Sequence, residues 1–498
     1  MTAYELGTDH PLPAHCHRTP PGHWIDGAWS TPRSERVTTV LDPATERALT
    51  TVPLAGESDV DLAVAAAARA FPAWAATPLR RRLEYVREFG ERLTSRVDEL
   101  ADVLTAETGM PRTVARNVQV EVGLGVLHAS LAQAESYPWQ VTVGDSLVRQ
   151  EPIGVVGCIT PWNVPVVMTM QKLVPALAAG CTLVFKPSEL APLNTYLLLE
   201  VLADCDLPPG VVNLVCGDGP TAGAALAAHP GVAAISLTGS VRAGAAVAAA
   251  AAPRIARVSL ELGGKNASIV LPEADFHTAV VSSVDQAMFN SGQACLAWSR
   301  LLVPRDRYDE AISLAVETAD ALAVGDPWAP GTRLGPVITA AARDRILDSV
   351  GRAAAAGASV RTGGTAVDGP GYYVRPTVLA DVHPDMPAAR TEIFGPVVSV
   401  MAYDDIDDAV RIADSTDYGL HGAVWSADTE HAVAVASRLR TGRVDINGAP
   451  FNVLAPFGGY KQSGNGRELG RWGFDAVCET KAIQFAPADG GGVRIGTS

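Results

Sequence analysis

Strand-forming and helix-forming segments alternate through the middle of the chain, and this alternation constrains the fold more than any other feature. Short runs rich in β-branched residues are separated by longer helical patterns, beginning near residue 148. Such alternation favours a parallel sheet with helices on both faces. The predicted strands are 154–160, 181–185, 211–215, 233–237 and 257–260, and the predicted helices are 166–179, 194–205, 222–228 and 242–252.

A second alternating unit begins near Asn266, and the chain of 498 residues is too long for one simple core. Its pattern predicts a strand at 267–271, a helix at 276–289, a strand at 300–303 and a helix at 309–322. We expect a second α/β domain there, and a mostly helical N-terminal portion over 59–108.

The charge and apolar runs exclude several classes of partner. Lys and Arg total 39 against 54 Asp and Glu, a net charge of −15, which disfavours nucleic acid and anionic membranes. The longest near-apolar run, 243–252, is too short to cross a bilayer. The N-terminus carries His10, His15 and His17 among prolines without the apolar core of a signal peptide. We therefore expect a cytoplasmic protein with no membrane or nucleic-acid partner.

Cys295 is the one cysteine whose neighbours suggest chemistry. The seven cysteines show no CxxC or Cys/His spacing, so we expect no disulfide framework and no metal site. Cys295 ends the segment Asn-Ser-Gly-Gln-Ala-Cys after an apolar helical stretch. A buried cysteine taken alone usually behaves as a small hydrophobe, so its meaning depends on its partners.

Two other side chains complete a set for thiol-based acyl chemistry. Glu261 follows a strand, and a buried glutamate with a raised pKa can act as a general base. Asn163 follows Pro161 and Trp162 in a turn, and its amide can donate to an oxyanion. Each also has a plain structural interpretation, as a strand end or a turn residue.

Two further segments suggest a dinucleotide. Thr238-Gly239-Ser240 leaves a strand and opens a helix, a site that favours phosphate, although a plain turn is about as common. Lys186 and Glu189 enclose Pro187-Ser188 and can hold two ribose hydroxyls; the alternative is a solvated turn capped by Ser188. Neither a P-loop nor a GxGxxG fingerprint is present.

The order and spacing of these blocks resemble the aldehyde dehydrogenase superfamily, NAD-dependent and hydrolytic in type, over residues 24–485. The blocks that carry the resemblance are Thr160 to Asn163, Lys186 to Glu189, Thr238 to Ser240, Leu260 to Asn266, Gly292 to Cys295, Glu392 to Val397, and Pro456 to Lys461 with Ser463-Gly464. The resemblance implies a Rossmann-like cofactor domain, an α/β catalytic domain and a small oligomerisation β-flap. The implied boundaries are 1–135 with 151–262, then 263–460, and for the flap 136–150 with 475–498.

The resemblance also implies a reaction. An aldehyde would be oxidised to a carboxylic acid through a thiohemiacetal and a thioester on Cys295, and water activated by Glu261 would hydrolyse the thioester. Asn163 and the Cys295 N–H would stabilise the oxyanion, and Lys172 matches a lysine near these groups. The implied cofactor is NAD rather than NADP, because the Glu189 carboxylate would repel a 2′-phosphate. We expect a small aldehyde substrate and a homodimer or homotetramer.

The resemblance carries a cofactor site and a substrate pocket onto this chain. The cofactor residues are Thr160, Pro161, Trp162, Lys186, Ser188, Glu189, Gly239, Ser240, Leu262, Gly263, Glu392 and Phe394. The pocket residues are Val164, Met168, Gln171, Leu296, Phe451, Val453 and Phe457. Val164 and Gln171 replace the aromatic residues frequent in the family, so we expect a wider, less aromatic pocket for bulkier aldehydes.

Two rival functions remain open. In a CoA-acylating aldehyde dehydrogenase a thiol resolves the thioester, and such an enzyme has no need of the base at Glu261. In a non-catalytic member of the fold the thiol, amide or base would be lost, and all three are present here. A thiol hydrolase would leave the ribose and phosphate positions without a role.

Overall fold

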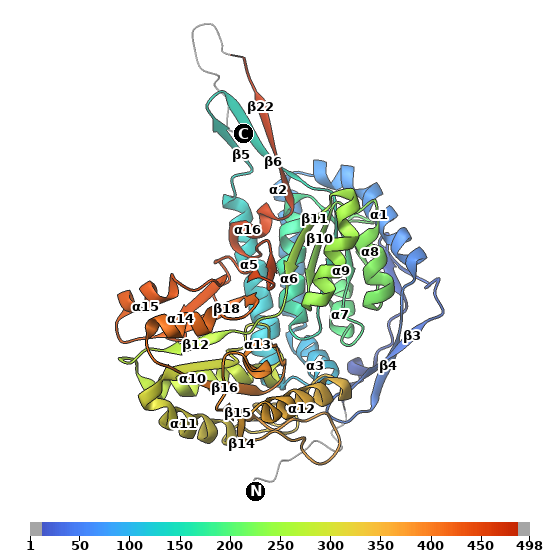
Figure 1. The fold of residues 1–498 in the computed structure, drawn as a ribbon. Coiled ribbons are helices and arrows are strands. Elements are labelled where there is room, and N and C mark those ends of the chain that lie inside the picture. The colour runs from blue at the N-terminus through green and yellow to red at the C-terminus, as the bar shows by residue number, and fades with distance from the viewer. Residues whose placement is uncertain (1–11, 487–498) are drawn as a thin grey trace.

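Two sheets, each covered by helices, form the body of the protein, and a three-stranded flap projects from it (Figure 1). The structure is a computed structural model that describes residues 12–486. It confirms the predicted α/β class. Residues 1–11 of the expected cofactor domain and 487–498 of the expected flap lie outside the described residues.

The first sheet has the order β2-β1-β9-β8-β7-β10-β11-β21, and its five central strands are parallel. All five predicted strands are present, with ends shifted by at most one residue. Pairing of Ile159 with Lys186 and of Thr238 with Glu261 brings the carboxyl ends of four strands to one edge. The bounds are β1 (His23–Ile25), β2 (Ala28–Ser30), β7 (Val155–Ile159), β8 (Thr182–Lys186), β9 (Val212–Leu214), β10 (Ala234–Thr238), β11 (Arg257–Glu261) and β21 (Gly464–Asn465).

The helices of this first lobe include one, α6, that is buried along its whole length. It packs against α5 and α7 as well as the sheet, so polar side chains such as Lys172 need internal partners. The helices are α1 (Glu57–Ala76), α2 (Leu79–Thr94), α3 (Val97–Thr108), α4 (Arg112–Val114), α5 (Glu121–Ser136), α6 (Pro165–Ala179), α7 (Leu193–Ala203), α8 (Ala224–Ala228) and α9 (Val241–Ala251).

The second lobe contains a sheet of order β14-β15-β16-β13-β12-β18-β19, parallel except for β14. The predicted elements from 267 to 322 are confirmed. Its strands are β12 (Ala267–Val270), β13 (Arg300–Pro304), β14 (Ser359–Thr362), β15 (Thr377–Ala380), β16 (Val397–Tyr403), β18 (His421–Trp425) and β19 (Arg443–Ile446). Its helices are α10 (Phe276–Met288), α11 (Tyr308–Asp320), α12 (Ala340–Ala355), α13 (Pro387–Arg390), α14 (Ile406–Asp414) and α15 (Thr429–Ala436).

Two connections that the sequence pattern did not predict tie the lobes together. The hairpin of β3 (Val37–Leu41) and β4 (Ala48–Pro53) runs along the body to the second lobe (Figure 1). There the Tyr372 N–H donates to the Pro43 carbonyl at 3.0 Å. In return, β21 leaves the second lobe and pairs with β11 at the edge of the first sheet. A two-stranded ribbon of β17 (Tyr418–Gly419) and β20 (Tyr460–Lys461) precedes it.

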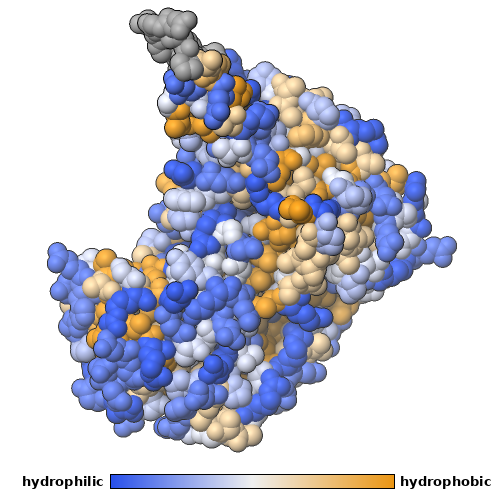
Figure 2. Space-filling model, turned by 45° about the horizontal axis from the view of Figure 1, so that its top comes forward, coloured by the Kyte–Doolittle hydropathy of each residue, from blue (hydrophilic) through white to orange (hydrophobic). Residues whose placement is uncertain are grey.

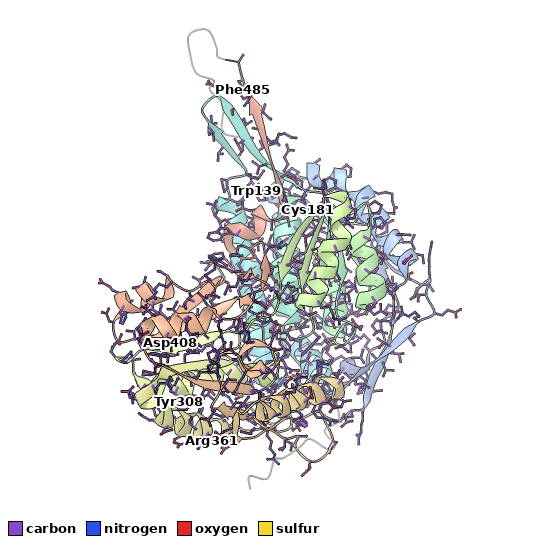
Figure 3. All side chains as sticks on the ribbon, in the orientation of Figure 1. Trp139, Cys181, Tyr308, Arg361, Asp408 and Phe485 are labelled. Atoms are coloured by element: carbon purple, nitrogen blue, oxygen red, sulfur yellow. The ribbon has the colours of Figure 1, made fainter. Side chains whose placement is uncertain are left out.

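The flap joins β5 (Gln140–Val143), β6 (Ser146–Pro152) and β22 (Cys478–Gln484) after the short α16 (Gly470–Asp475). The edge strand β5 is exposed throughout, and Val143 is 61% exposed. Figure 2 shows apolar residues on the flap surface, and Figure 3 places Trp139 at its base and Phe485 towards its tip. Unpaired apolar edges of this kind need a covering strand.

The cysteines of the described chain form no disulfide, and six of the seven are buried while Cys295 is partly exposed. Between residues 12 and 486, no cluster of three or more His, Cys, Asp or Glu side chains has the arrangement of a metal site. Over the same residues, no helix has both the length and the apolar character needed to cross a membrane.

Candidate active site

The loop that carries Cys295 follows α10 and a short turn, η5 (Phe289–Gly292). Three consecutive residues ending at Gly292 have positive φ values of 50°, 54° and 72°. A Cβ on Gly292 would lie 1.9 Å from the Gly395 carbonyl oxygen, so only glycine fits. This close contact packs the nucleophile motif against the predicted motif that begins at Glu392.

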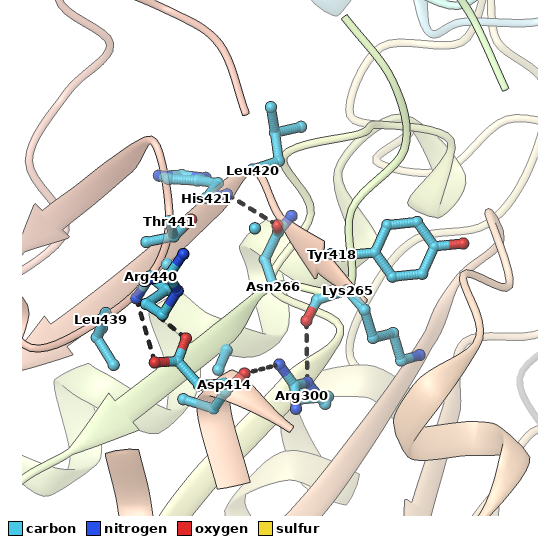
Figure 4. A pocket seen from close by; sticks show the side chains of 14 residues that line it. Lys265, Asn266, Arg300, Asp414, Tyr418, Leu420, His421, Leu439, Arg440 and Thr441 are labelled. Carbon is cyan, nitrogen blue, oxygen red and sulfur yellow. Dashed lines mark hydrogen bonds between the residues drawn. The ribbon is translucent and has the colours of Figure 1, made fainter. Parts of the chain in front are cut away.

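Asn266 holds the Cys295 loop in place through hydrogen bonds to its backbone. Its amide Nδ2 donates to the backbone carbonyls of Cys295, at 2.8 Å, and Ala297, at 2.9 Å. Its Oδ1 accepts from the His421 N–H at 3.0 Å (Figure 4). Asn266 ends one of the blocks that carry the resemblance, but its positioning role was not predicted; the available signal was an amide residue directly before an apolar strand.

Asn163, the predicted oxyanion donor, lies beside the same loop. Its Nδ2 donates to the Gln293 carbonyl at 2.8 Å, and Asn290 Nδ2 donates to the Asn163 carbonyl at 3.2 Å. Among the described residues, these contacts use only one of the two amide N–H bonds of Asn163. Asn163 therefore contacts Gln293, two residues before Cys295 in the chain, and its second amide N–H remains available as a donor.

Glu261, the predicted base, ends β11 and is 2% exposed. Neither carboxylate oxygen has a hydrogen-bond partner among the described residues. Burial, and then the charge of Glu468, raise the pKa of Glu261 well above its ordinary value. A carboxylate in this environment readily accepts a proton.

Lys172 does not lie free beside Asn163 but forms a buried ion pair. Its Nζ is 2.5 Å from Glu468 Oε1 and 2.9 Å from Ser236 Oγ, and both charged side chains are at most 5% exposed. The opposite charge of Lys172 also lowers the pKa of the nearby Glu261, against the larger effect of burial. Glu468 is a site residue that sequence reasoning missed.

Gln171 does not line the substrate cavity, contrary to the prediction. It lies one helical turn further along α6 than Met168, and this rise of about 5 Å places it in a separate small cavity with Lys172, Ser236 and Glu468. Its side-chain amide has no partner among the described residues. Val453 also lies outside the cavity lining and packs on the main core.

The surroundings of Cys295 favour the neutral thiol over the thiolate. Burial, followed by the charges of Glu392 and Glu261, raises the pKa of Cys295 to about 12. The backbone N–H groups of Cys295 and Leu296 face the sulfur and act in the opposite direction. The thiol therefore needs a proton acceptor before it can attack, and a negative charge near it meets two N–H donors.

A cavity of about 310 Å³ is lined in part by Cys295. This size is at the lower end of small-molecule sites. The structure places five of the seven predicted pocket residues in its wall: Val164, Met168, Leu296, Phe451 and Phe457. Further apolar lining residues are Val118, Val122, Val167, Phe289 and Trp298.

The expectation of a less aromatic pocket holds on one wall alone. The wall formed by α6 is aliphatic, with Val164, Val167 and Met168. The opposite wall carries the rings of Phe289, Trp298, Phe451 and Phe457. The sequence argument placed Phe451 and Phe457 in the pocket but judged its character only from the positions without aromatic residues, and it missed Phe289 and Trp298.

A helix N-terminus lies at the carboxyl edge of the first sheet, as predicted. Ser240 caps α9, its Oγ accepting from the Ala243 N–H at 3.2 Å, and the first turn of α9 contains no acidic residue. The Gly239 N–H donates to the Glu261 carbonyl at 2.9 Å, and a Cβ on Gly239 would find no atom closer than 3.7 Å. This open N-terminus, which lacks acidic residues in its first turn, fits a pyrophosphate.

The predicted ribose pair lies at the end of the neighbouring strand β8. Lys186 Nζ donates to the carbonyls of Pro187, at 2.9 Å, and Gly217, at 2.6 Å, and is 3.6 Å from Glu189 Oε2. Ser188 Oγ accepts from the Leu190 N–H at 3.3 Å, which is the capping role weighed for it. Lys186 is thus held in place, while Glu189 remains one-third exposed towards the edge.

Glu392 and Phe394 lie across from this edge. Glu392 Oε1 accepts from the Gly264 N–H at 3.0 Å, and a Cβ on Gly263 would lie 2.1 Å from its Oε2. Phe394 has a φ of 57° and packs edge-on against Trp162, with 5.8 Å between ring centroids. Burial raises the pKa of Glu392 to about 7.

The remaining predicted cofactor residues follow the carboxyl ends of β7 and β11. The Thr160 N–H donates to the Lys186 carbonyl at 3.1 Å, and the Leu262 N–H donates to the Ser463 carbonyl at 2.9 Å. Pro161 follows Thr160 in the turn before α6. A buried, unpartnered hydroxyl on Thr160 and an open glycine edge fit a dinucleotide lying across the first sheet.

The family model for the aldehyde dehydrogenase family matches residues 29–483. The chain therefore belongs to the aldehyde dehydrogenase family, and its class is that of oxidoreductases acting on aldehydes.

Two characterised relatives and two solved structures are similar to the chain over nearly its whole length. A 3-succinoylsemialdehyde-pyridine dehydrogenase from a Pseudomonas species is 45% identical, covering 92% of this chain and 97% of the relative. Geranial dehydrogenase from Castellaniella defragrans is 41% identical, covering 92% and 98%. Aldehyde dehydrogenase C of Pseudomonas syringae, a cysteine-to-alanine variant with NAD+ and octanal, has a TM-score of 0.94 at 45% identity, covering 97% and 99%. A Mycobacterium tuberculosis aldehyde dehydrogenase with NAD+ has a TM-score of 0.92 at 37% identity, covering 94% and 98%.

Proposed function

We propose that the protein oxidises an apolar aldehyde to its carboxylic acid with NAD, through a covalent intermediate on Cys295. The observation that carries the proposal is the position of Cys295. Its side chain opens into the apolar cavity, and the charges of Glu261 and Glu392 both act on it. One sulfur thus lies between a substrate site, a base and the cofactor edge.

In the first step, the Cys295 thiol releases its proton to solvent, and the sulfur attacks the aldehyde carbon to form a thiohemiacetal. The oxyanion would accept hydrogen bonds from the free amide N–H of Asn163 and from the backbone N–H of Cys295. Preorganised donors of this kind lower a barrier because they need no reorganisation as charge develops.

The residues at the sheet edge would hold NAD, which supplies the acceptor for the hydride that leaves the substrate carbon. Glu189 with Lys186 would bind the adenine ribose, Ser240 with Gly239 and Trp162 the pyrophosphate, and Glu392 with Phe394 the nicotinamide ribose and ring. The Glu189 carboxylate favours NAD over NADP, because it would repel a 2′-phosphate.

In the second step, Glu261 would take a proton from water as its oxygen attacks the thioester carbon. The carbon–sulfur bond breaks and the acid leaves, and the sulfur of Cys295 takes up the proton held by Glu261, which restores both the thiol and the carboxylate. The two charges of the Lys172–Glu468 ion pair act on Glu261 in opposite directions. The charge of Glu468 raises the pKa of Glu261, and the charge of Lys172 lowers it. We assign Lys172 and Glu468 the role of positioning residues that set this balance.

We further propose that the flap joins two copies of the chain. Support comes from the exposed edge strand β5 and from Val141, Val143 and Phe485, which are 41%, 61% and 36% exposed. A second copy would cover these residues. Size-exclusion chromatography that yields a dimer or tetramer supports the proposal, and a monomer contradicts it.

The test of the reaction is NADH formation by the purified protein with short aliphatic, long aliphatic, terpenoid and aromatic aldehydes. We expect turnover, highest for the longer or bulkier aldehydes, and its loss in Cys295→Ala. The product, assayed with and without CoA, should be the free acid in both cases. An acyl-CoA product would establish the rival reaction, and a folded protein that oxidises no aldehyde with either NAD or NADP would contradict the proposal.

A further inference from the structure

Three ionisable side chains form a hydrogen-bonded chain in the wall of the otherwise apolar substrate cavity. They are Arg443 and Asp445 on β19 and His421 at the start of β18. Arg443 and Asp445 are two residues apart, so their side chains point to the same face of the sheet. His421 pairs in register with Arg443 on the neighbouring strand. The three groups therefore meet on one face.

Asp445 fixes the orientation of Arg443. Arg443 Nε donates to Asp445 Oδ1 at 2.8 Å and Arg443 Nη2 to Oδ2 at 3.1 Å, while His421 Nε2 lies 2.9 Å from Oδ2. Burial by itself would raise the pKa of Asp445, but the hydrogen bonds and charges of His421 and Arg443 bring it below its ordinary value. The carboxylate is thus ionised and holds the planar guanidinium by two bonds.

The outer nitrogen of Arg443 is left without a partner. Among residues 12–486, no acceptor receives a hydrogen bond from Nη1, which carries two N–H donors. The guanidinium carbon lies 4.7 Å from the centroid of the Phe451 ring, and the Arg443 side chain is 16% exposed. Both residues line the cavity. An apolar ligand in the cavity would strip water from these donors and leave them unpaired, which is unfavourable.

The same chain of contacts reaches the nucleophile loop. His421 Nδ1 lies 3.1 Å from the carbonyl of Leu296, the residue that follows Cys295. The donors of Arg443 therefore have a defined position relative to the sulfur. A substrate whose aldehyde carbon lies at Cys295 presents a particular part of its chain to Arg443.

We propose that Arg443 is a specificity-determining residue that donates from Nη1 to a neutral oxygen, a ketone or hydroxyl, on the chain of the aldehyde substrate. The inference rests on the proposed aldehyde oxidation and specifies its substrate class. A carboxylate is a poorer match, because Asp445 already neutralises Arg443 and a second anion would be desolvated beside it. Asp445 and His421 act as positioning residues.

The test compares three aldehydes of equal chain length: a plain alkanal, an alkanal with a ketone within its chain, and one that ends in a carboxylate. The full-length protein and Arg443→Met are assayed for NADH formation with each. Arg81→Met is the matched control, because Arg81 also lies over an aromatic ring, that of Tyr85 at 4.4 Å, but on the exposed surface. Arg443→Gln replaces Arg443→Met if the latter fails to fold by thermal melting.

We expect the wild type to prefer the keto-aldehyde. In Arg443→Met the kcat/KM for this substrate should fall about ten-fold, mainly through KM, while that for the alkanal stays the same or rises. An unchanged ratio between the two substrates, or a wild-type preference for the carboxylate, would overturn the inference while leaving aldehyde oxidation intact. A wild type that oxidises none of the three contradicts the proposed function itself.

Discussion

Two successive turns in the first half of helix α6 have opposite surroundings. At its start, Val164, Val167 and Met168 form an aliphatic wall of the substrate cavity. One turn further, Gln171 and Lys172 face a small polar cavity that contains a buried ion pair. Adjacent turns of one helix thus face an apolar cavity and a polar one.

This comparison shows that burial has different consequences for apolar and for charged side chains in these two turns. Apolar residues at the start of α6 are stabilised by shape, and a volume change there alters which ligand fits. A charged residue such as Lys172 is tolerated only because Glu468 and Ser236 pair with it. We therefore expect substitutions in the turn that faces the substrate cavity to change substrate specificity. Substitutions in the polar turn, at Gln171 and Lys172, should change catalysis or stability.

The largest effect is expected at Glu261, whose pKa responds to the charges of Lys172 and Glu468 beside the polar turn of α6. Glu261→Gln should lower steady-state turnover by about 10²- to 10⁴-fold, because water attack on the thioester loses its base. Stopped-flow measurement should still show a single burst of NADH, since hydride transfer precedes hydrolysis. Loss of the burst together with turnover would show that Glu261 acts at an earlier step. Glu135→Gln, at an exposed glutamate paired with Arg87, is the control.

The raised pKa of Glu261 also sets a pH dependence. Protonation removes the base, so wild-type kcat should fall as the pH drops through this raised pKa. The folded-state pKa lies above the unfolded value of about 4.3, so the fold loses stability as the pH rises and Glu261 ionises. Glu261→Gln should therefore melt at an equal or higher temperature at neutral pH. A clearly lower melting temperature would be inconsistent with an unpaired buried carboxylate.

An intermediate effect, on stability, is expected at Lys172. Lys172→Met leaves Glu468 buried without its cation, and the free energy of unfolding should fall by about 3–5 kcal/mol. Lys481→Met is the matched control, because Lys481 makes an ion pair of equal length, 2.5 Å, with Glu151 but is 56% exposed. Its loss should change the free energy by about 1 kcal/mol or less. Equal shifts in the urea midpoints of both variants would contradict the idea that the buried ion pair in the polar turn of α6 contributes more to stability than an exposed one.

The smallest effect, on substrate specificity, is expected at the start of α6, where Val164 lines the substrate cavity. Val164→Phe adds a ring to the aliphatic wall and should lower kcat/KM for long or branched aldehydes about ten-fold relative to a short aldehyde. Val433→Phe, at a valine that is 50% exposed, is the control for the added volume. A uniform loss across all aldehydes would indicate that Val164 affects the nucleophile loop rather than the size of the cavity.

Much of the fold was predictable because its signals are local. Each parallel strand is a short apolar run that ends in a distinctive residue, as with Ile159 before Thr160 and Leu260 before Glu261. Parallel strands place these ends at one edge, so motifs far apart in the chain could be assigned to one site. The elements from 154 to 322 followed from this pattern.

What escaped prediction depends on contacts between distant segments. Lys172 and Glu468 are 296 residues apart, and neither neighbourhood indicates the other. The hairpin of β3 and β4 gains its meaning only from its contact with Tyr372 in the second lobe. Gln171 was misplaced because the resemblance assigned it to the pocket by position alone, whereas in this structure its side chain lines the second, smaller cavity.

By itself, the sequence determined the α/β class and the order of the elements, and it singled out Cys295, Glu261 and Asn163 as candidate reactive groups. These follow from hydrophobic periodicity and from the chemistry of individual side chains, which are properties of short segments. Only the tertiary structure decided which charges pair, where the cavity lies and that Arg443 enters it. Pairing and cavity shape arise where several distant segments meet, and no local pattern encodes such a meeting.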